Sequence, residues 1–274
     1  MNVLKSIFDF YIKSSIHVAL AAVAFAAITM REFGIARDDL LLIFIFLGTI
    51  TGYNFVKYAG IAKLHHLTLT KNLRAIQIFS FFCFVALVYV LFQQPLPVIV
   101  VSGILGILTA LYALPVFWQK QNLRSINGMK ASVIAFVWAG VTVVLPVLHT
   151  SVLSYTHILI EFIQRFLFVI VLILPFDIRD LRYDIAGLGT IPQQIGVKRS
   201  RILGAVLLVV VILLELLERP IQPQAVVLMV IICTITALLV RMSVLHQSQY
   251  YASFWVEGVP IFWWLLLMAA GKIG

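Results

Sequence analysis

Residues 154–176 read SYTHILIEFIQRFLFVIVLILPF, an apolar run that leads directly into the acidic segment Asp177-Ile-Arg-Asp180-Leu-Arg-Tyr-Asp184. The run is long enough to cross a bilayer, because a spanning helix needs about 20 mostly apolar residues. Eight further runs of similar character lie on either side of it. The sequence therefore predicts an all-α integral membrane protein, a bundle of nine transmembrane helices.

The composition supports this class and excludes others. The chain has 274 residues, of which 62% are hydrophobic and 11% charged, and its mean hydropathy is +1.08. Soluble domains average about 25% charged residues, so a water-soluble enzyme is excluded. Cys83 and Cys233 both lie in apolar runs, which excludes a disulfide framework and a cysteine zinc site. The net charge of +9 fits basic cytoplasmic loops, and we expect membrane lipid and no nucleic acid as partner.

Short connections with turn residues separate the nine candidate spans. The first span is the weakest, because it is short and rich in alanine. The chain therefore reads as one polytopic transmembrane domain over residues 1–274, with no separate soluble domain. The spans lie near residues 14–30, 40–58, 74–92, 97–117, 129–149, 154–176, 200–217, 223–241 and 251–271.

The basic residues predict the orientation. If the N-terminus is cytoplasmic, 15 of the 20 Lys and Arg residues fall on that side and four on the other. Cytoplasmic loops carry the excess of basic residues in membrane proteins, and this bias also supports an odd number of spans. We therefore expect a multi-pass protein of the cytoplasmic (inner) membrane, with any chemistry on its cytoplasmic face.

The carboxylates are unevenly distributed. No Asp or Glu occurs between Asp39 and Glu161, and then Asp177, Asp180 and Asp184 follow within eight residues. At 100° per residue these three fall on one face of a helix. Clustered carboxylates repel one another, and hard oxygen ligands suit Mg²⁺. The alternative is a solvated helix end, in which the aspartates pair with neighbouring Arg and Lys residues.

The acidic segment resembles a known motif. Residues 177–196, with Asp180, Asp184 and the Gly, Thr and Gly residues that follow, resemble the second aspartate-rich motif of the UbiA superfamily of intramembrane prenyltransferases. A second stretch also resembles the family, in its fourth span and the basic loop after it. Nine spans with a cytoplasmic N-terminus are likewise the family architecture. The second stretch is Leu111-Tyr112-Ala-Leu-Pro115, Leu123-Arg124, Gly128-Met-Lys130 and Trp138.

The resemblance implies a reaction class. Such proteins bind a polyprenyl diphosphate through Mg²⁺ and transfer the prenyl group to an aromatic or other lipophilic acceptor in a lipid-facing cavity. It implies that Asp180 and Asp184 are catalytic, that Asp177, Asp180 and Asp184 hold Mg²⁺, and that one amide and three basic side chains contact the diphosphate. Those contacts are assigned to Asn54, Lys57, Arg124 and Lys130.

The first aspartate-rich motif of the family is missing. The matching stretch reads Gly52-Tyr-Asn54-Phe-Val-Lys57-Tyr58 and contains no carboxylate. Asn54, Lys57 and Tyr58 share one helical face, so a lysine cation could contact the diphosphate where a metal normally would. Alternatively, Lys57 is an ordinary basic loop residue in an inactive relative. The two interpretations have equal weight.

Two acidic residues lie inside other spans. Glu161 and Arg165 are four residues apart and predict a self-neutralising pair. Glu257 has no local partner, so we expect a role in helix packing first and in an acceptor pocket second. Three functional classes follow: a prenyltransferase, a non-catalytic prenyl- or lipid-binding protein on the same scaffold, and a transporter. The transporter is disfavoured, because its polar residues should lie at the midplane and the Asp cluster lies at one edge.

Overall fold

The computed structural model describes residues 3–58, 71–116, 122–126, 128–148, 154–182, 189–217 and 223–271. All regular structure within these ranges is helical, which confirms the all-α class. The helices are α1 (Val3–Lys13), α2 (Ile16–Glu32), α3 (Asp39–Tyr58), α4 (Lys71–Leu91), α5 (Leu96–Ala113), α6 (Met129–Ala139), α7 (Leu145–Val147), α8 (Tyr155–Asp180), α9 (Ile191–Glu215), α10 (Pro223–Met242) and α11 (Val259–Ala270), with a 3-10 turn, η3 (Leu123–Ser125), and two π-helical segments, η4 (Gly140–Val144) and η5 (Tyr251–Val256).

Seven helical segments in the described ranges are long and apolar enough to cross a membrane, and the number is eight if the bent pair α1–α2 forms one span. These eight coincide with eight of the nine expected spans. The expected span at 200–217 lies in α9, which forms but carries Lys198, Arg199 and Arg201 along its first half. Those charges lower its hydropathy. The total of nine and the side of the N-terminus stay predictions.

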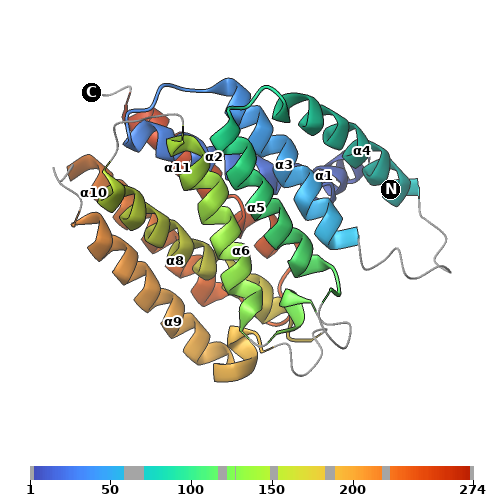
Figure 1. Cartoon of the computed structure of the whole chain (residues 1–274). Helices are drawn as coiled ribbons and strands as arrows, with labels where there is room; N and C mark the ends of the chain where they lie inside the picture. The colour runs from blue at the N-terminus through green and yellow to red at the C-terminus, as the bar shows by residue number, and fades with distance from the viewer. Residues whose placement is uncertain are drawn as a thin grey trace.

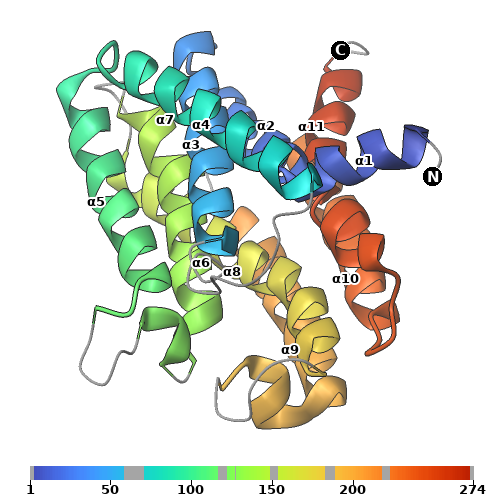
Figure 2. The same cartoon turned by 90° about the vertical axis from the view of Figure 1, so that its right-hand side faces the viewer.

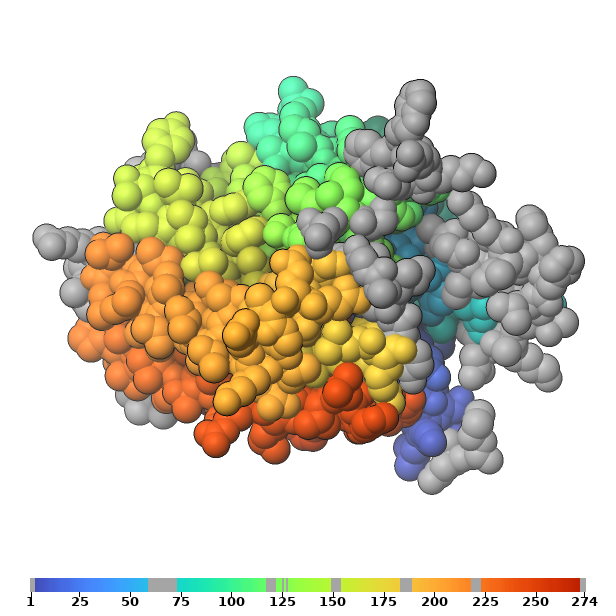
Figure 3. All heavy atoms as spheres, turned by 90° about the horizontal axis from the view of Figure 1, so that it is seen from below, coloured from blue at the N-terminus to red at the C-terminus, as the bar shows by residue number. Residues whose placement is uncertain are grey.

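The alanine-rich helix α2 lies at the centre of the bundle. It packs against α3, α11 and η4, and twelve of its 17 residues are buried. Figures 1 and 2 show α3, α4 and α5 on one side of it and α8, α9 and α10 on the other. Seen from below, α9 covers one face of the molecule beside the C-terminal helices (Figure 3). Small side chains let neighbouring backbones approach closely, which explains why this alanine-rich helix is so enclosed.

The expected pair of Glu161 and Arg165 is confirmed inside the bundle. The Arg165 guanidinium forms an ion pair with Glu161 and donates to the Thr29 hydroxyl of α2 at 3.3 Å. It also lies 4.0 Å from the centroid of the Phe25 ring. These contacts bind α8 to the central helix, because a cation in a low-dielectric interior needs both a counter-charge and hydrogen-bond acceptors.

The break between α1 and α2 lies at the end of the bundle that contains the candidate site. The two helices meet at 53°, and Ser15 there adopts a left-handed conformation with φ 67°. Such a backbone costs energy for a residue with a side chain, so neighbouring contacts must hold it. Those contacts come from α3 and belong to the candidate site.

Candidate functional site

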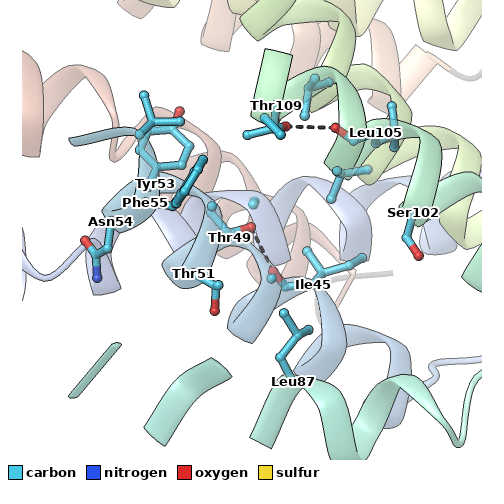
Figure 4. Close-up of a pocket in the computed structure, with 18 of the residues that line it drawn as sticks. Ile45, Thr49, Thr51, Tyr53, Asn54, Phe55, Leu87, Ser102, Leu105 and Thr109 are labelled. Carbon is cyan, nitrogen blue, oxygen red and sulfur yellow. Dashed lines mark hydrogen bonds between the residues drawn. The ribbon is translucent and has the colours of Figure 1, made fainter. Parts of the chain in front are cut away.

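A large cavity lies between α3, α4, α5 and α6. Its volume is about 860 Å³, near the upper end of the range for small-molecule sites. Several of its hydroxyl groups are turned into their own helices: Thr49 donates to the Ile45 carbonyl at 2.7 Å and Thr109 to the Leu105 carbonyl at 2.8 Å (Figure 4). The buried Thr51 hydroxyl, by contrast, has no hydrogen-bond partner among the described residues. With Thr49 and Thr109 engaged, most of the wall is apolar and suits a hydrocarbon chain.

One end of the cavity is polar. Tyr53, Asn54 and Tyr58, all on the last turns of α3, belong to its lining. The Trp138 indole of α6 donates to the Tyr53 hydroxyl at 2.7 Å, and the two rings meet edge to face. We call the end of the bundle that contains Asn54 the polar end. The cavity is thus long and apolar, with polar side chains at one end.

Asn54 is buried and fully bonded at the polar end. Its side-chain amide donates to the Ser14 carbonyl at 2.9 Å and to the Ser80 hydroxyl of α4 at 2.8 Å. Its oxygen accepts from the Ser15 hydroxyl at 2.8 Å. Asn54 therefore holds the α1–α2 break against α3 and α4, which is a structural role beside the diphosphate contact that we expected.

An alanine at position 54 is expected to lower the free energy of unfolding by about 2–4 kcal/mol, because three hydrogen bonds of about 0.5–1.5 kcal/mol each are lost. Thermal unfolding in detergent measures the change. Thr49→Val is the matched control, since the Thr49 hydroxyl bonds only within α3. Equal melting temperatures for Asn54→Ala and the parent would contradict the structural role.

Lys57 lies one turn beyond Asn54 and is exposed. Its ammonium group donates to the Ser15 hydroxyl at 2.8 Å, and so it is held at the polar end without a direct carboxylate partner among the described residues. It lies 5.9 Å from the centroid of the Tyr53 ring, which lines the cavity. Asn54 and Lys57 both bond to Ser15, as expected for two residues on one face of α3, and their contact with a diphosphate stays a prediction.

Two of the expected site residues, Asp177 and Lys130, pair with each other, which the sequence did not predict. Asp177, 1% exposed, forms an ion pair with Lys130 at 2.9 Å. The two were expected to act separately, Asp177 on a metal and Lys130 on the diphosphate. Because each side chain already neutralises the other, the pair locks the start of α6 to the end of α8.

Asp180 lies one turn further along α8 and is partly exposed. Both oxygens of its carboxylate accept hydrogen bonds from Arg179, at 2.7 and 3.2 Å. Arg124, in the 3-10 turn η3, is exposed. Asp184, the second motif aspartate, lies outside the described residues.

The described carboxylates do not form a cluster of metal ligands. No group of three or more His, Cys, Asp or Glu side chains that could hold a metal ion occurs within the described ranges. Asp177 and Asp180 each have a cationic partner instead. The part of the chain described here does not by itself form a Mg²⁺ site, so the metal stays a prediction that depends on Asp184.

Glu257 lies near the polar end. From the sequence we expected a role in helix packing first and a role in an acceptor pocket second. It follows the π-helical segment η5. Its carboxylate acts electrostatically on Lys57 of α3 and Arg179 of α8. Among these three described side chains, none forms a direct ion pair with another. Glu257 also acts on Tyr53. Glu257 and the two cations therefore lie within electrostatic range of one another, and Arg179 is bonded to Asp180 as well. Spacing along the chain gave no signal of this, because Glu257 and Lys57 are 200 positions apart.

The fold and this arrangement define a class: an all-helical membrane bundle with an apolar cavity that is polar at one end. The structure is similar to a solved structure of a digeranylgeranylglyceryl phosphate synthase, a membrane prenyltransferase of the UbiA superfamily. The TM-score is 0.57, the identity is 15%, and the match covers 97% of this chain and 98% of the other. At this identity the similarity confirms the fold that the sequence predicted. No family model and no curated protein matches the sequence.

Proposed function

We propose that this protein transfers a prenyl group from a polyprenyl diphosphate to a lipophilic acceptor within the membrane. The observation that carries the proposal is the cavity of about 860 Å³, whose wall is mostly apolar and whose polar end is lined by Tyr53, Asn54 and Tyr58. Lys57 lies beside the Tyr53 ring, and Glu257 acts electrostatically on Lys57 and Arg179. Such a site matches a substrate with an isoprenoid tail and an anionic head. The UbiA-type fold supports the same reaction class. We place the polar end on the cytoplasmic side.

The reaction breaks the bond between the allylic carbon and the diphosphate oxygen. The electron pair leaves with the diphosphate, the acceptor forms a bond to the allylic carbon, and the acceptor loses a proton. Lys57 and Arg179 stabilise the charge that develops on the leaving diphosphate. The apolar wall excludes water, which would otherwise capture the carbocation. Glu257, which acts electrostatically on both cations, receives the proton released by the acceptor.

Mg²⁺ held by Asp180 and Asp184 would add further neutralisation of the leaving group when bound. In the described residues Asp180 is already bonded to Arg179, so binding a metal there requires the Arg179 side chain to turn away. The same movement would free the guanidinium for the diphosphate.

The test is diphosphate release by the purified protein in lipid nanodiscs, supplied with geranylgeranyl diphosphate, a pool of quinol and phenol acceptors, and Mg²⁺. We expect release by the parent, loss of release on chelation with EDTA, and a decrease of tenfold or more for Asp180→Asn. Asp39→Asn is the matched control, because Asp39 is an exposed carboxylate at the opposite end of α3. Release that is equal in Asp180→Asn and the parent would remove Asp180 from the site.

A second function has one observation in its favour. The carboxylates expected on α3 are absent, and Asp177 is neutralised by Lys130. A chain that binds prenyl lipids without turning them over fits these facts. Binding of geranylgeranyl diphosphate without any release of diphosphate, with or without Mg²⁺, would establish this function in place of the enzyme.

A further inference from the structure

The apolar face of α1 continues beyond the bundle. Tyr11, in the inner part of this helix, donates a hydrogen bond to Nδ1 of His17 on α2 at 2.7 Å. Further out, Val3 is 71% exposed, Leu4 74% and Ile7 62%. At 100° per residue, Leu4 and Ile7 lie on the same helical face as Tyr11. The face that packs on α2 is therefore uncovered in the outer part of α1, which extends away from the bundle (Figure 2).

The opposite face of α1 is polar. Lys5, Asp9 and Lys13 follow one another at intervals of four residues and lie on one side of the helix. The Asp9 carboxylate pairs with Lys13 at 3.6 Å and accepts a hydrogen bond from the Tyr250 hydroxyl. Two lysines and one aspartate leave a net charge of +1 on this face. Helices divided in this way lie in the plane of the membrane interface, and so small a charge gives little attraction to anionic lipid.

The chain does not need α1 to cross the membrane. Helix α2 alone has 17 residues, and spanning helices have about 17–25. The axis of α1 departs from that of α2 by 53°. Between α1 and α4 lies a pocket of about 300 Å³, whose lining includes Ile7 and Ala75. The side chains of the bundle thus leave space beside the outer part of α1, where lipid can contact it.

We propose that α1 is a membrane-surface helix, which lies in the interface of the leaflet at the polar end with Leu4 and Ile7 among the acyl chains and Lys5 toward water. Lipid is the partner, and not a second copy of the chain, because three side chains are far fewer than the roughly 20–30 residues a side of a stable protein interface. The uncovered face also continues the lipid-exposed surface of the neighbouring α4, where Ile78 is 59% and Phe82 65% exposed. This inference does not depend on the proposed reaction.

The position of α1 acts on the candidate site through the α1–α2 break. The Ser14 carbonyl and the Ser15 hydroxyl accept and donate the hydrogen bonds of Asn54, and Ser15 also accepts from Lys57. The left-handed backbone of Ser15 persists only where its surroundings hold it. Asn54 holds the break from within the bundle, and the contact of α1 with lipid holds it from outside.

A nitroxide label on an introduced cysteine measures the depth of α1 in lipid nanodiscs. Leu4→Cys and Ile7→Cys test the apolar face, and Lys5→Cys is the matched control on the polar face. The unsubstituted protein gives the background, because Cys83 and Cys233 are buried. Collisions of each label are measured with oxygen, which concentrates in hydrocarbon, and with a water-soluble nickel chelate, in phosphatidylcholine with and without phosphatidylglycerol.

The ratio of oxygen to nickel collisions is expected to be about threefold or more higher at positions 4 and 7 than at position 5, and to change less than about twofold with phosphatidylglycerol. Preference of all three labels for the nickel chelate would place α1 in water and overturn the inference. Shielding of positions 4 and 7 from both reagents would reveal a protein partner and overturn it as well. So would a seating that occurs only with the anionic lipid.

Hydrogen exchange tests the link between α1 and the candidate site. The double variant Leu4→Glu with Ile7→Glu removes the apolar face, and amide exchange over residues 14–18 is expected to become about tenfold faster, since the break then opens locally. Lys5→Glu is the matched control and should exchange within about twofold of the parent, whereas Asn54→Ala breaks the same contacts from within and should exchange faster. Exchange in the double variant equal to that of the parent would overturn the link.

Discussion

Asp177→Asn is expected to lower the free energy of unfolding by about 3–5 kcal/mol, the effect of removing one partner of a buried ion pair. Asp177 is 1% and Lys130 9% exposed, and their charged atoms lie 2.9 Å apart. Without the carboxylate, the buried ammonium group keeps the cost of leaving water and loses its counter-charge. The measurement is thermal unfolding of the purified variant in detergent.

A double variant provides the control. Lys130→Met combined with Asp177→Leu removes both charges and is expected to unfold close to the parent, because a buried pair can be replaced by apolar residues of similar volume at little cost. A melting temperature for Asp177→Asn equal to that of the parent would show that the pair does not stabilise the fold. In that case Asp177 returns to the metal role that the sequence predicted.

Lys57→Ala is expected to weaken binding and turnover of geranylgeranyl diphosphate by tenfold or more, since a hydrogen bond to a charged group contributes about 1.5–3 kcal/mol. The Lys57 ammonium is exposed, is held by Ser15 and lies near the polar end of the cavity. The thermal stability of the variant should stay near that of the parent, because the lost bond lies at an exposed position. Isothermal titration and diphosphate release measure the two effects.

Lys13→Ala is the matched control for general positive charge. Lys13 lies at the same end of the bundle, where its exposed ammonium group pairs with Asp9 at 3.6 Å. We expect less than a twofold change for this variant. Equal losses at Lys13 and Lys57 would mean that the polar end attracts the diphosphate only through its overall charge.

Local patterns in the sequence predicted much of the fold. Apolar runs of about 20 residues placed eight helical segments correctly, and the spacing of Glu161 and Arg165 predicted their ion pair, because i and i+4 meet on any helix. The resemblance of residues 177–196 to the UbiA motif predicted the fold that the comparison confirms. Each of these patterns lies within a single helix or segment, so it is visible in the sequence alone.

Contacts between distant helices could not be predicted in this way. Lys130 and Asp177 lie 47 positions apart, and no periodicity links them. The same holds for Glu257, which acts electrostatically on Lys57 and Arg179 only because the last helix packs against the central helix α2. The shared-face rule on α8 placed Asp177 and Asp180 on one side, but the distance from the start of α6 decided that Asp177 pairs with Lys130.

The enclosed position of α2 has a consequence for how the protein is made. Its partners include the last segments of the chain: the His17 imidazole donates a hydrogen bond to the Phe254 carbonyl at 2.9 Å, and Phe25 packs edge to face on Trp263. The translocon releases the first span long before the last one has been synthesised. Until then this alanine-rich helix stays in the bilayer without its final neighbours, although it is poorly suited to lipid. Ribosome-bound chains that stop before α11 should therefore be the species that membrane quality-control proteases recognise.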